Sequence, residues 1–369
     1  MLRRFVSHSA AFLFTLVFTA CLTNGPALAS RRSSGFVYIA TNDVQNAIVQ
    51  YARAADGALT WMAQAPTGGS GTGAIGVDPL ASEDSLALSS DGSALVVVNA
   101  ASNEVSSLSV GNTGIQPRST VSSNGVFPNS VAIHGSLVYV LNSKGTPNIS
   151  GFRLDETGVL SAIPGSSRDL PGGAAAGAHD IRFSPDGARL LVAEGGNNQI
   201  DVFHIDNSGL ATSVQTTASS EAVPFAIRFA RNGSVIVVEA GSASVSSYHL
   251  GSDDSLALIS SAVANGQKAT CWLSVTPDGK FVFTSNTGSK TFSSYLVSGI
   301  GSLNLANAVA AYADGGANID SSITSDGSFL YAVDSAKGRV LAYRIRGASL
   351  HPLPVTSGLP LSVQGIAAD

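Results

Sequence analysis

The chain repeats one phrase seven times between Phe36 and Asp369: a short apolar run, a tight polar turn, and two further apolar runs. The runs are rich in Val, Ile, Leu, Phe and Tyr, as β-strands are. A spacing of about 45 residues is typical of the four-stranded blade of a β-propeller. The sequence therefore predicts an all-β fold, a seven-bladed β-propeller. The turn is clearest in Ser89-Ser90-Asp91-Gly92, Ser184-Pro185-Asp186-Gly187, Thr276-Pro277-Asp278-Gly279 and Thr324-Ser325-Asp326-Gly327.

The two ends of the repeat complete one another. Residues 36–42, 48–53 and 59–64 match second, third and fourth strands, but no first strand precedes them. Residues 362–369 have the pattern of that missing strand, and Asp369 falls where the turn Asp falls in other blades. We therefore expect the C-terminal strand to pair with the N-terminal blade and close the ring, which hides sheet edges.

The first 29 residues resemble an export signal. Arg3 and Arg4 precede an apolar stretch over residues 10–22, and Ala27-Leu28-Ala29 forms a small-x-small cleavage site. The sequence thus predicts a signal peptide over 1–29, a propeller domain over 30–369, and a periplasmic or secreted protein. Lipid attachment at Cys21 is the less favoured alternative, because Phe18 is a poor first residue for that motif. No later run reaches the ~20 apolar residues of a membrane span.

Charge and composition restrict the partners. The formal net charge is -5, and no basic cluster follows the N-terminus, so nucleic acid is not expected. We expect a monomer that binds a small molecule, with no cofactor and no metal. Carboxylates in the loops around the axis leave Ca²⁺ as an alternative cofactor.

The phase of the repeat determines which loops share a face. The loop that enters a first strand and the loop that leaves a second strand lie together, opposite the Asp-Gly turn. These loops predict an acidic, Asn-lined funnel at the axis. Its candidate residues are Asn129, His179, Asp180, Glu194, Phe225, Glu239, Trp272 and Asn286.

Three of these residues have side chains suited to proton transfer. His179 is a candidate general acid and base because an imidazole titrates near neutral pH; the alternative is a loop histidine bonded to a backbone carbonyl. Glu239 and Glu194 could activate water or orient His179. The alternative is that both carboxylates accept hydrogen bonds from local backbone amides.

Two arginines interrupt a column of small residues. Arg182 and Arg228 occupy equivalent first-strand positions, where other blades have Ala or Ser. They either reach the central channel and bind substrate or form structural ion pairs with Glu194 and Glu239. Trp272 either stacks on a ligand or packs between blades. Asp180, Phe225, Asn286 and Asn129 complete the predicted substrate-binding set.

Three segments carry a resemblance to a known family: residues 178–187 (AHDIRFSPDG), 237–241 (VVEAG) and 270–279 (TCWLSVTPDG). The chain resembles the seven-bladed lactonases, which include 6-phosphogluconolactonase and 3-carboxy-cis,cis-muconate cyclase. The resemblance implies that His179 and Glu239 occupy site positions. Phe225 and Thr287 stand where family members have arginines. Loss of these cations disfavours a strongly anionic substrate.

The expected function is an exported lactonase-like hydrolase or a lactonising, cycloisomerase-type enzyme. Its substrate would be a neutral or weakly anionic lactone bound at the axial funnel. The alternative is a non-catalytic propeller that binds a ligand or a protein on the same face, because a fold does not determine a function.

Overall fold

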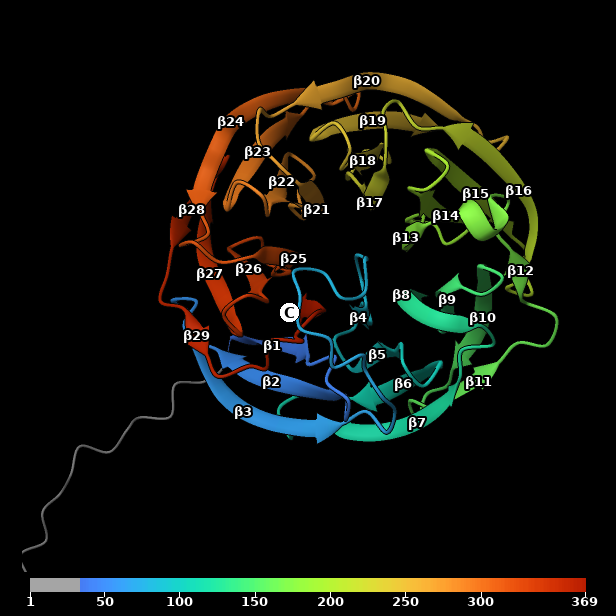
Figure 1. Ribbon diagram of the computed structural model, residues 1–369, viewed down its shortest axis with the longest axis horizontal. Helices are drawn as coiled ribbons and strands as arrows, with labels where there is room; N and C mark the ends of the chain where they lie inside the picture. The colour runs from blue at the N-terminus through green and yellow to red at the C-terminus, as the bar shows by residue number, and fades with distance from the viewer. Residues whose placement is uncertain (1–33) are drawn as a thin grey trace, which may run out of the picture. The chain divides into compact units, whose positions relative to one another are not determined.

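The computed structural model describes residues 34–369, so the predicted signal peptide and Cys21 lie outside the described residues. Seven antiparallel sheets surround one axis as the blades of a propeller, which confirms the predicted fold (Figure 1). Blade 1 consists, from first to fourth strand, of β30 (Ile366–Ala368), β1 (Gly35–Ala40), β2 (Ala47–Arg53) and β3 (Leu59–Pro66). Blade 2 consists of β4 (Leu86–Leu88), β5 (Ala94–Asn99), β6 (Glu104–Ser109) and β7 (Gln116–Ser122). Blade 3 consists of β8 (Val126–His134), β9 (Leu137–Lys144), β10 (Asn148–Leu154) and β11 (Leu160–Ala162).

Blades 4 to 7 have the same order. Blade 4 consists of β13 (Ala178–Phe183), β14 (Arg189–Glu194), β15 (Gln199–Ile205) and β16 (Ala211–Ala218), and blade 5 of β17 (Pro224–Phe229), β18 (Val235–Glu239), β19 (Ser244–Leu250) and β20 (Leu256–Ala264). Blade 6 consists of β21 (Thr270–Val275), β22 (Phe281–Asn286), β23 (Thr291–Val297) and β24 (Leu303–Tyr312). Blade 7 consists of β25 (Asn318–Ile323), β26 (Phe329–Asp334), β27 (Arg339–Arg346) and β28 (Ser349–Pro352).

Short additional elements lie in two blades and one loop. In blades 3 and 7 a second short strand pairs with the third strand, so two segments share the outer position. The sequence did not predict this division. These elements are β12 (Arg168–Asp169), β29 (Thr356–Ser357) and the 3₁₀ helix η1 (Gly173–Ala175).

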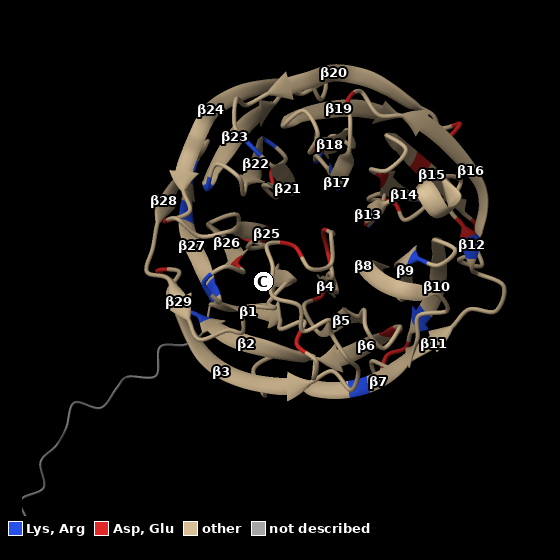
Figure 2. Cartoon of the chain, in the orientation of Figure 1, with Lys and Arg blue, Asp and Glu red and all other residues tan. Residues whose placement is uncertain are grey.

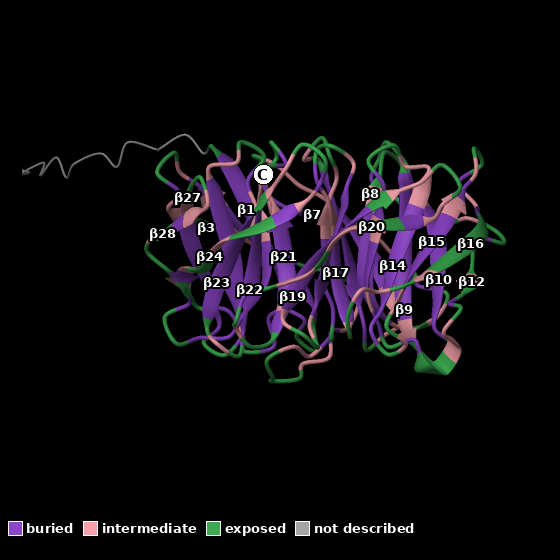
Figure 3. Ribbon diagram, turned by 90° about the horizontal axis from the view of Figure 1, so that it is seen from above, coloured by how far each residue is buried: buried purple, intermediate pink, exposed green. Residues whose placement is uncertain are grey.

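The burial of each strand follows from its position in the blade. Second strands such as β5, β14, β18 and β26 are buried almost throughout, since neighbouring blades pack on both of their faces. Such strands are continuous apolar runs and not alternating ones. Fourth strands such as β16 are largely exposed. In the side view, buried strands fill the middle of the disc and exposed loops lie on both faces (Figure 3).

The chain closes its own ring, as the sequence predicted. β30 pairs antiparallel with β1, placing Ile366 opposite Ile39 and Ala368 opposite Val37. The amide of Asp369 donates to the carbonyl of Phe36 at 2.9 Å. Blade 1 therefore contains both ends of the described chain.

The Asp-Gly turns are held by their own side chains. In blade 4 the Ser184 hydroxyl and the Ala188 amide both donate to Asp186 Oδ1, at 2.6 and 3.1 Å. Gly187 has φ of +71°, a conformation that side chains with a Cβ rarely adopt. The hydrogen bond from Ser184 lowers the pKa of Asp186 below its ordinary value.

Asp186→Ala is expected to lower the free energy of unfolding by about 1 kcal/mol, because two turn donors lose their acceptor. Asp186→Asn is the matched control, since Asn232 accepts the Ser234 amide at 3.1 Å in the turn of blade 5. Because the carboxyl pKa is lowered in the fold, this stabilisation is present above the unfolded pKa and is lost as pH falls through the folded pKa. Urea unfolding of both variants measures the difference; equal losses would contradict it.

Candidate functional site

A long segment between β3 and β4, residues 67–85, crosses the centre of the face where the funnel was expected (Figure 1). The Trp272 indole donates to the Ser82 carbonyl at 2.9 Å, and the Glu83 amide donates to the His179 carbonyl at 3.1 Å. The Gln364 side chain donates to Asp78 Oδ1 at 2.7 Å. The segment is thus bound to blades 6, 4 and 1, and we call residues 78–84 the axial plug.

The plug carries acidic residues to the axis (Figure 2), and Arg182 and Arg228 form ion pairs with them. Arg228 lies 2.8 Å from Glu83, 3.0 Å from Asp84 and 3.3 Å from Asp180. Arg182 pairs with Asp84. These five residues form what we call the axial ion cluster. Arg228 therefore pairs with Glu83, Asp84 and Asp180, and Arg182 pairs with Asp84, so the predicted alternative of ion pairs with Glu194 and Glu239 is wrong.

Burial raises the pKa of two carboxyl groups in this cluster. Desolvation raises the pKa of Glu83 to about 7, although the Arg228 guanidinium opposes the shift. Desolvation also raises the pKa of Asp180, again against Arg228. A buried carboxyl group with a raised pKa is disfavoured as an anion, and the arginines are what keep the cluster close to neutral.

Glu239 is buried at the end of β18 and accepts several hydrogen bonds. Its donors are the hydroxyls of Ser246, Ser244 and Ser219, at 2.7, 3.0 and 3.1 Å, and the Glu221 amide at 3.2 Å. This carboxylate ties together the loops and strands of its own blade.

Glu194 has the same position in blade 4. It accepts from the Gln199 and Asn197 side chains at 2.8 and 3.0 Å and from the Gly172 amide at 3.2 Å. Within residues 34–369, neither Glu194 nor Glu239 hydrogen-bonds to His179. Residues at or near the end of the second strand bind neighbouring loops in other blades too, for example Asn142, Asn286 and Asp334.

His179 lies beside the plug, and one contact determines the tautomer of its neutral ring. Its Nδ1 is 2.7 Å from the Ala81 carbonyl oxygen. A carbonyl only accepts, so Nδ1 carries the hydrogen, and in the neutral ring Nε2 has the free lone pair. Burial lowers the pKa of His179, which favours this neutral ring. Nε2 makes no hydrogen bond to any described residue.

Aromatic packing and a glycine orient the His179 ring. The ring stacks on Phe225 with centroids 4.4 Å apart and an interplanar angle of 21°, and Phe225 in turn meets Trp272 edge to face at 5.4 Å. A Cβ at Gly195 would lie 2.5 Å from His179 Nε2. The absence of a Cβ at Gly195 therefore gives the His179 ring its room at Nε2. Trp272 packs against Phe225, and its N–H is satisfied by the Ser82 carbonyl.

A pocket of about 220 Å³ lies next to this ring, between blades 3 and 4. We call it the His179 pocket. Asn129 donates to the Ala178 carbonyl at 3.0 Å, but its buried Oδ1 has no partner in the described part of the chain. The Lys144 ammonium lies 3.4 Å from the centroid of the Phe127 ring. The lining residues are Pro79, Leu80, Ala81, Phe127, Asn129, Ser143, Lys144, Gly177, Ala178 and His179.

The structure thus divides the predicted site residues into groups. His179 and Asn129 share a pocket, and Phe225 and Trp272 stack behind the histidine. Asp180, Arg182 and Arg228 belong to the axial ion cluster. Asn286 is buried and bonds within blade 6, to Asn265, Thr270, Thr291 and Ser293.

The sequence interpretation missed the role of the plug. The available signal was length, because residues 67–85 separate two strands without any repeat pattern, and long ordered loops in compact domains are usually functional. Among residues 34–369, no group of three or more His, Cys, Asp or Glu is arranged to hold a metal ion. No helix in this part of the chain is long and apolar enough to cross a membrane.

Several solved structures share the fold. A provisionally assigned 6-phosphogluconolactonase of Bacteroides uniformis is 20% identical, with 89% of this chain and 99% of that chain covered and a TM-score of 0.69. A protein of Lactobacillus plantarum is 17% identical over 91% and 99% of the two chains, with a TM-score of 0.72. The periplasmic gluconolactonase PpgL of Pseudomonas aeruginosa is 15% identical over 89% and 98%, with a TM-score of 0.68.

At these identities the likeness establishes the fold alone, and no curated protein matches the sequence. The sequence profile described as "Lactonase, 7-bladed beta-propeller" matches residues 149–250 and 237–356, which together make up more than half of the chain. The chain therefore belongs to the seven-bladed β-propeller lactonase family.

Proposed function

We propose that the protein opens or closes a lactone ring in the His179 pocket. The observation that carries this proposal is the bond from His179 Nδ1 to the Ala81 carbonyl, which places the hydrogen of the neutral ring on Nδ1 and leaves Nε2 as its basic nitrogen. A neutral imidazole nitrogen beside a pocket is a suitable general base. The family match supports the same class of chemistry.

In the hydrolytic direction, Nε2 takes a proton from water as the water oxygen attacks the lactone carbonyl carbon. The carbonyl π electrons move to its oxygen, and Lys144 is the cation of the pocket that can stabilise this oxyanion. Collapse of the intermediate breaks the bond to the ring oxygen, which takes the proton back from the imidazolium. Hydroxy acid and neutral His179 result, and lactonisation is the reverse sequence.

Three other predicted residues position the histidine or the loops around it. Glu194 precedes Gly195, whose backbone lies against the His179 ring, so Glu194 acts as a positioning residue. Phe225 fixes the ring plane by stacking. Glu239 holds the loops of blade 5.

The substrate and the location complete the proposal. Lys144 supplies a single cation to the pocket, and Phe225 occupies an arginine position of the family, so a neutral or weakly anionic lactone fits best. We propose that residues 1–29 direct export. The periplasmic gluconolactonase among the structural relatives is compatible with that location.

Turnover is expected to depend on pH through His179. Protonation of Nε2 removes the base, so kcat/KM should be constant at neutral pH and fall on the acid side, with an apparent pKa below the ordinary value near 6.5 because burial lowers it. This profile is measured by following the protons released when the mature chain hydrolyses a panel of neutral, carboxylated and phosphorylated lactones. An acid limb near pH 7 would point to Glu83 instead. Absence of turnover with the whole panel would favour the non-catalytic alternative.

A further inference from the structure

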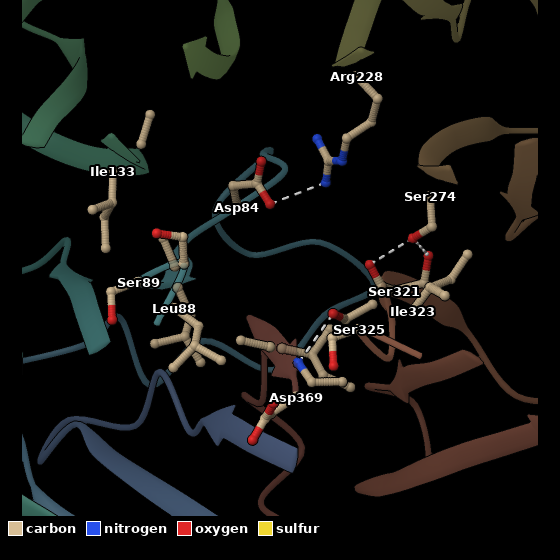
Figure 4. Close-up of a pocket in the computed structure, with 18 of the residues that line it drawn as sticks. Asp84, Leu88, Ser89, Ile133, Arg228, Ser274, Ser321, Ile323, Ser325 and Asp369 are labelled. Atoms are coloured by element: carbon tan, nitrogen blue, oxygen red, sulfur yellow. Dashed lines mark hydrogen bonds and ion pairs between the residues drawn. The ribbon is translucent and has the colours of Figure 1, made fainter. Parts of the chain in front are cut away.

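A second cavity, of about 400 Å³, lies on the axis behind the plug (Figure 4). Its walls are first strands, and its rim includes the turn residues Ser89 and Ser325 and the C-terminal Asp369. It therefore belongs to the face of the Asp-Gly turns, opposite the His179 pocket. We call it the axial cavity.

The base of the axial cavity has hydrogen-bonding capacity that the protein does not use. Asp84, Arg182 and Arg228 line it. Arg182 bonds to Asp84 through Nη2, while its buried Nε has no partner among residues 34–369. The Arg182 side chain is 29% exposed, so part of the guanidinium faces the cavity. The exposed part of this guanidinium, and not the buried Nε, can donate to a ligand that offers an oxygen acceptor.

The charge at the base argues against an anion. Arg182 and Arg228 are already paired with Glu83, Asp84 and Asp180, so the axial ion cluster has no positive charge to spare. The Asp369 side chain adds negative charge at the rim. An incoming phosphate or carboxylate would meet these groups, whereas a neutral ligand would not.

The walls combine hydroxyl groups with aliphatic side chains. The Ser274 and Ser321 hydroxyls lie 2.9 Å apart, and the Ser322 hydroxyl accepts the Ala368 amide at 3.0 Å. Leu88 and Ile323 line the cavity between these polar groups (Figure 4). A ligand must therefore both donate and accept hydrogen bonds and also present C–H surface.

We propose that the axial cavity is a second ligand site, which binds a neutral polyhydroxylated molecule of the size of a monosaccharide. A hydroxyl group donates to Asp84 or to a serine and accepts from Arg182 at the same time. The C–H faces of a sugar or cyclic polyol suit the aliphatic residues. The volume lies within the range of small-molecule pockets.

Isothermal titration calorimetry of the full chain with D-glucose and with myo-inositol tests this proposal, with D-gluconate as the anionic counterpart. At least one neutral polyol is expected to bind at one site per chain and more tightly than D-gluconate. Ala87→Leu fills the cavity wall and should weaken binding about tenfold or more. Ala257→Leu, on the exposed outer strand β20, is the matched control and should not. Arg182→Lys, which removes the planar fork, is a second variant if Ala87→Leu fails to fold.

Three results would overturn the proposal: no binding of either neutral polyol, unchanged affinity in both cavity variants, or tighter binding of D-gluconate than of the neutral probes. His179→Gln separates the two sites. Binding in the axial cavity should be unaffected by this change, because His179 lies on the other side of the plug. Loss of polyol binding in His179→Gln would place the ligand in the His179 pocket and would also refute the axial site.

Discussion

A chain that lacks residues 361–369 is expected not to form a stable ring. This segment supplies β30, whose Ile366 and Ala367 are buried together with the preceding Val363. Each such apolar side chain contributes roughly 1–3 kcal/mol. Gly365 also donates its amide to the buried Asp320 at 2.7 Å, so its loss leaves a carboxylate without that donor. Because domains are stable by only about 5–15 kcal/mol, the deletion removes most or all of the stability.

Thermal unfolding followed by circular dichroism measures this effect. A synthetic peptide of residues 361–369 should restore a cooperative transition when it is added to the truncated chain, since β30 is held by its backbone pairing with β1 and by the burial of Ile366 and Ala367. The control peptide carries Gln364→Ala. It loses the bonds from Gln364 to Asp78 and Ser82 and should restore less. An unchanged melting temperature after truncation would refute ring closure as a source of stability.

His179→Gln is expected to lower kcat/KM for a lactone about 10²–10⁴-fold, the usual contribution of a general base. Glutamine keeps a polar group near the Ala81 carbonyl but has no lone-pair nitrogen to accept a proton. His351→Gln, on the exposed part of β28, is the matched control and should retain activity. Unfolding curves of the two variants show whether the loss comes from chemistry or from stability.

Gly195→Ala tests the role of His179 Nε2 without changing the histidine itself. The added Cβ would come within 2.5 Å of His179 Nε2, so activity should fall although the histidine is intact. Gly299→Ala adds the same group where nothing lies within 4 Å, and it should have no effect. Full activity in both His179→Gln and Gly195→Ala would exclude His179 Nε2 as the base.

The strands could be predicted because each blade repeats the same local pattern. Burial of the second strands requires continuous apolar runs, and the turns require Asp and Gly, so both features are visible in the sequence. Ring closure was predictable for the same reason, since residues 362–369 supply the one strand missing from the repeat.

The plug was not predictable in this way. Ser82 and Glu83 have no periodic pattern, and their positions depend on partners distant in the sequence, such as Trp272, Gln364 and Arg228. The sequence interpretation left two roles open for Arg182 and Arg228: substrate binding in the central channel, or ion pairs with Glu194 and Glu239. Those glutamates instead bond to serines, amides and backbone groups of their own blades.

The pairing of β30 with β1 has a consequence for the connectivity of the chain. The backbone of Asp369 bonds to Phe36, so the two ends of the ring already lie next to each other in one hairpin-like position. A peptide link there would turn the propeller into a continuous loop with no natural start. The chain could then be cut at another Asp-Gly turn, for example between Asp278 and Gly279, and a circularly permuted protein would contain the same blades in a rotated order.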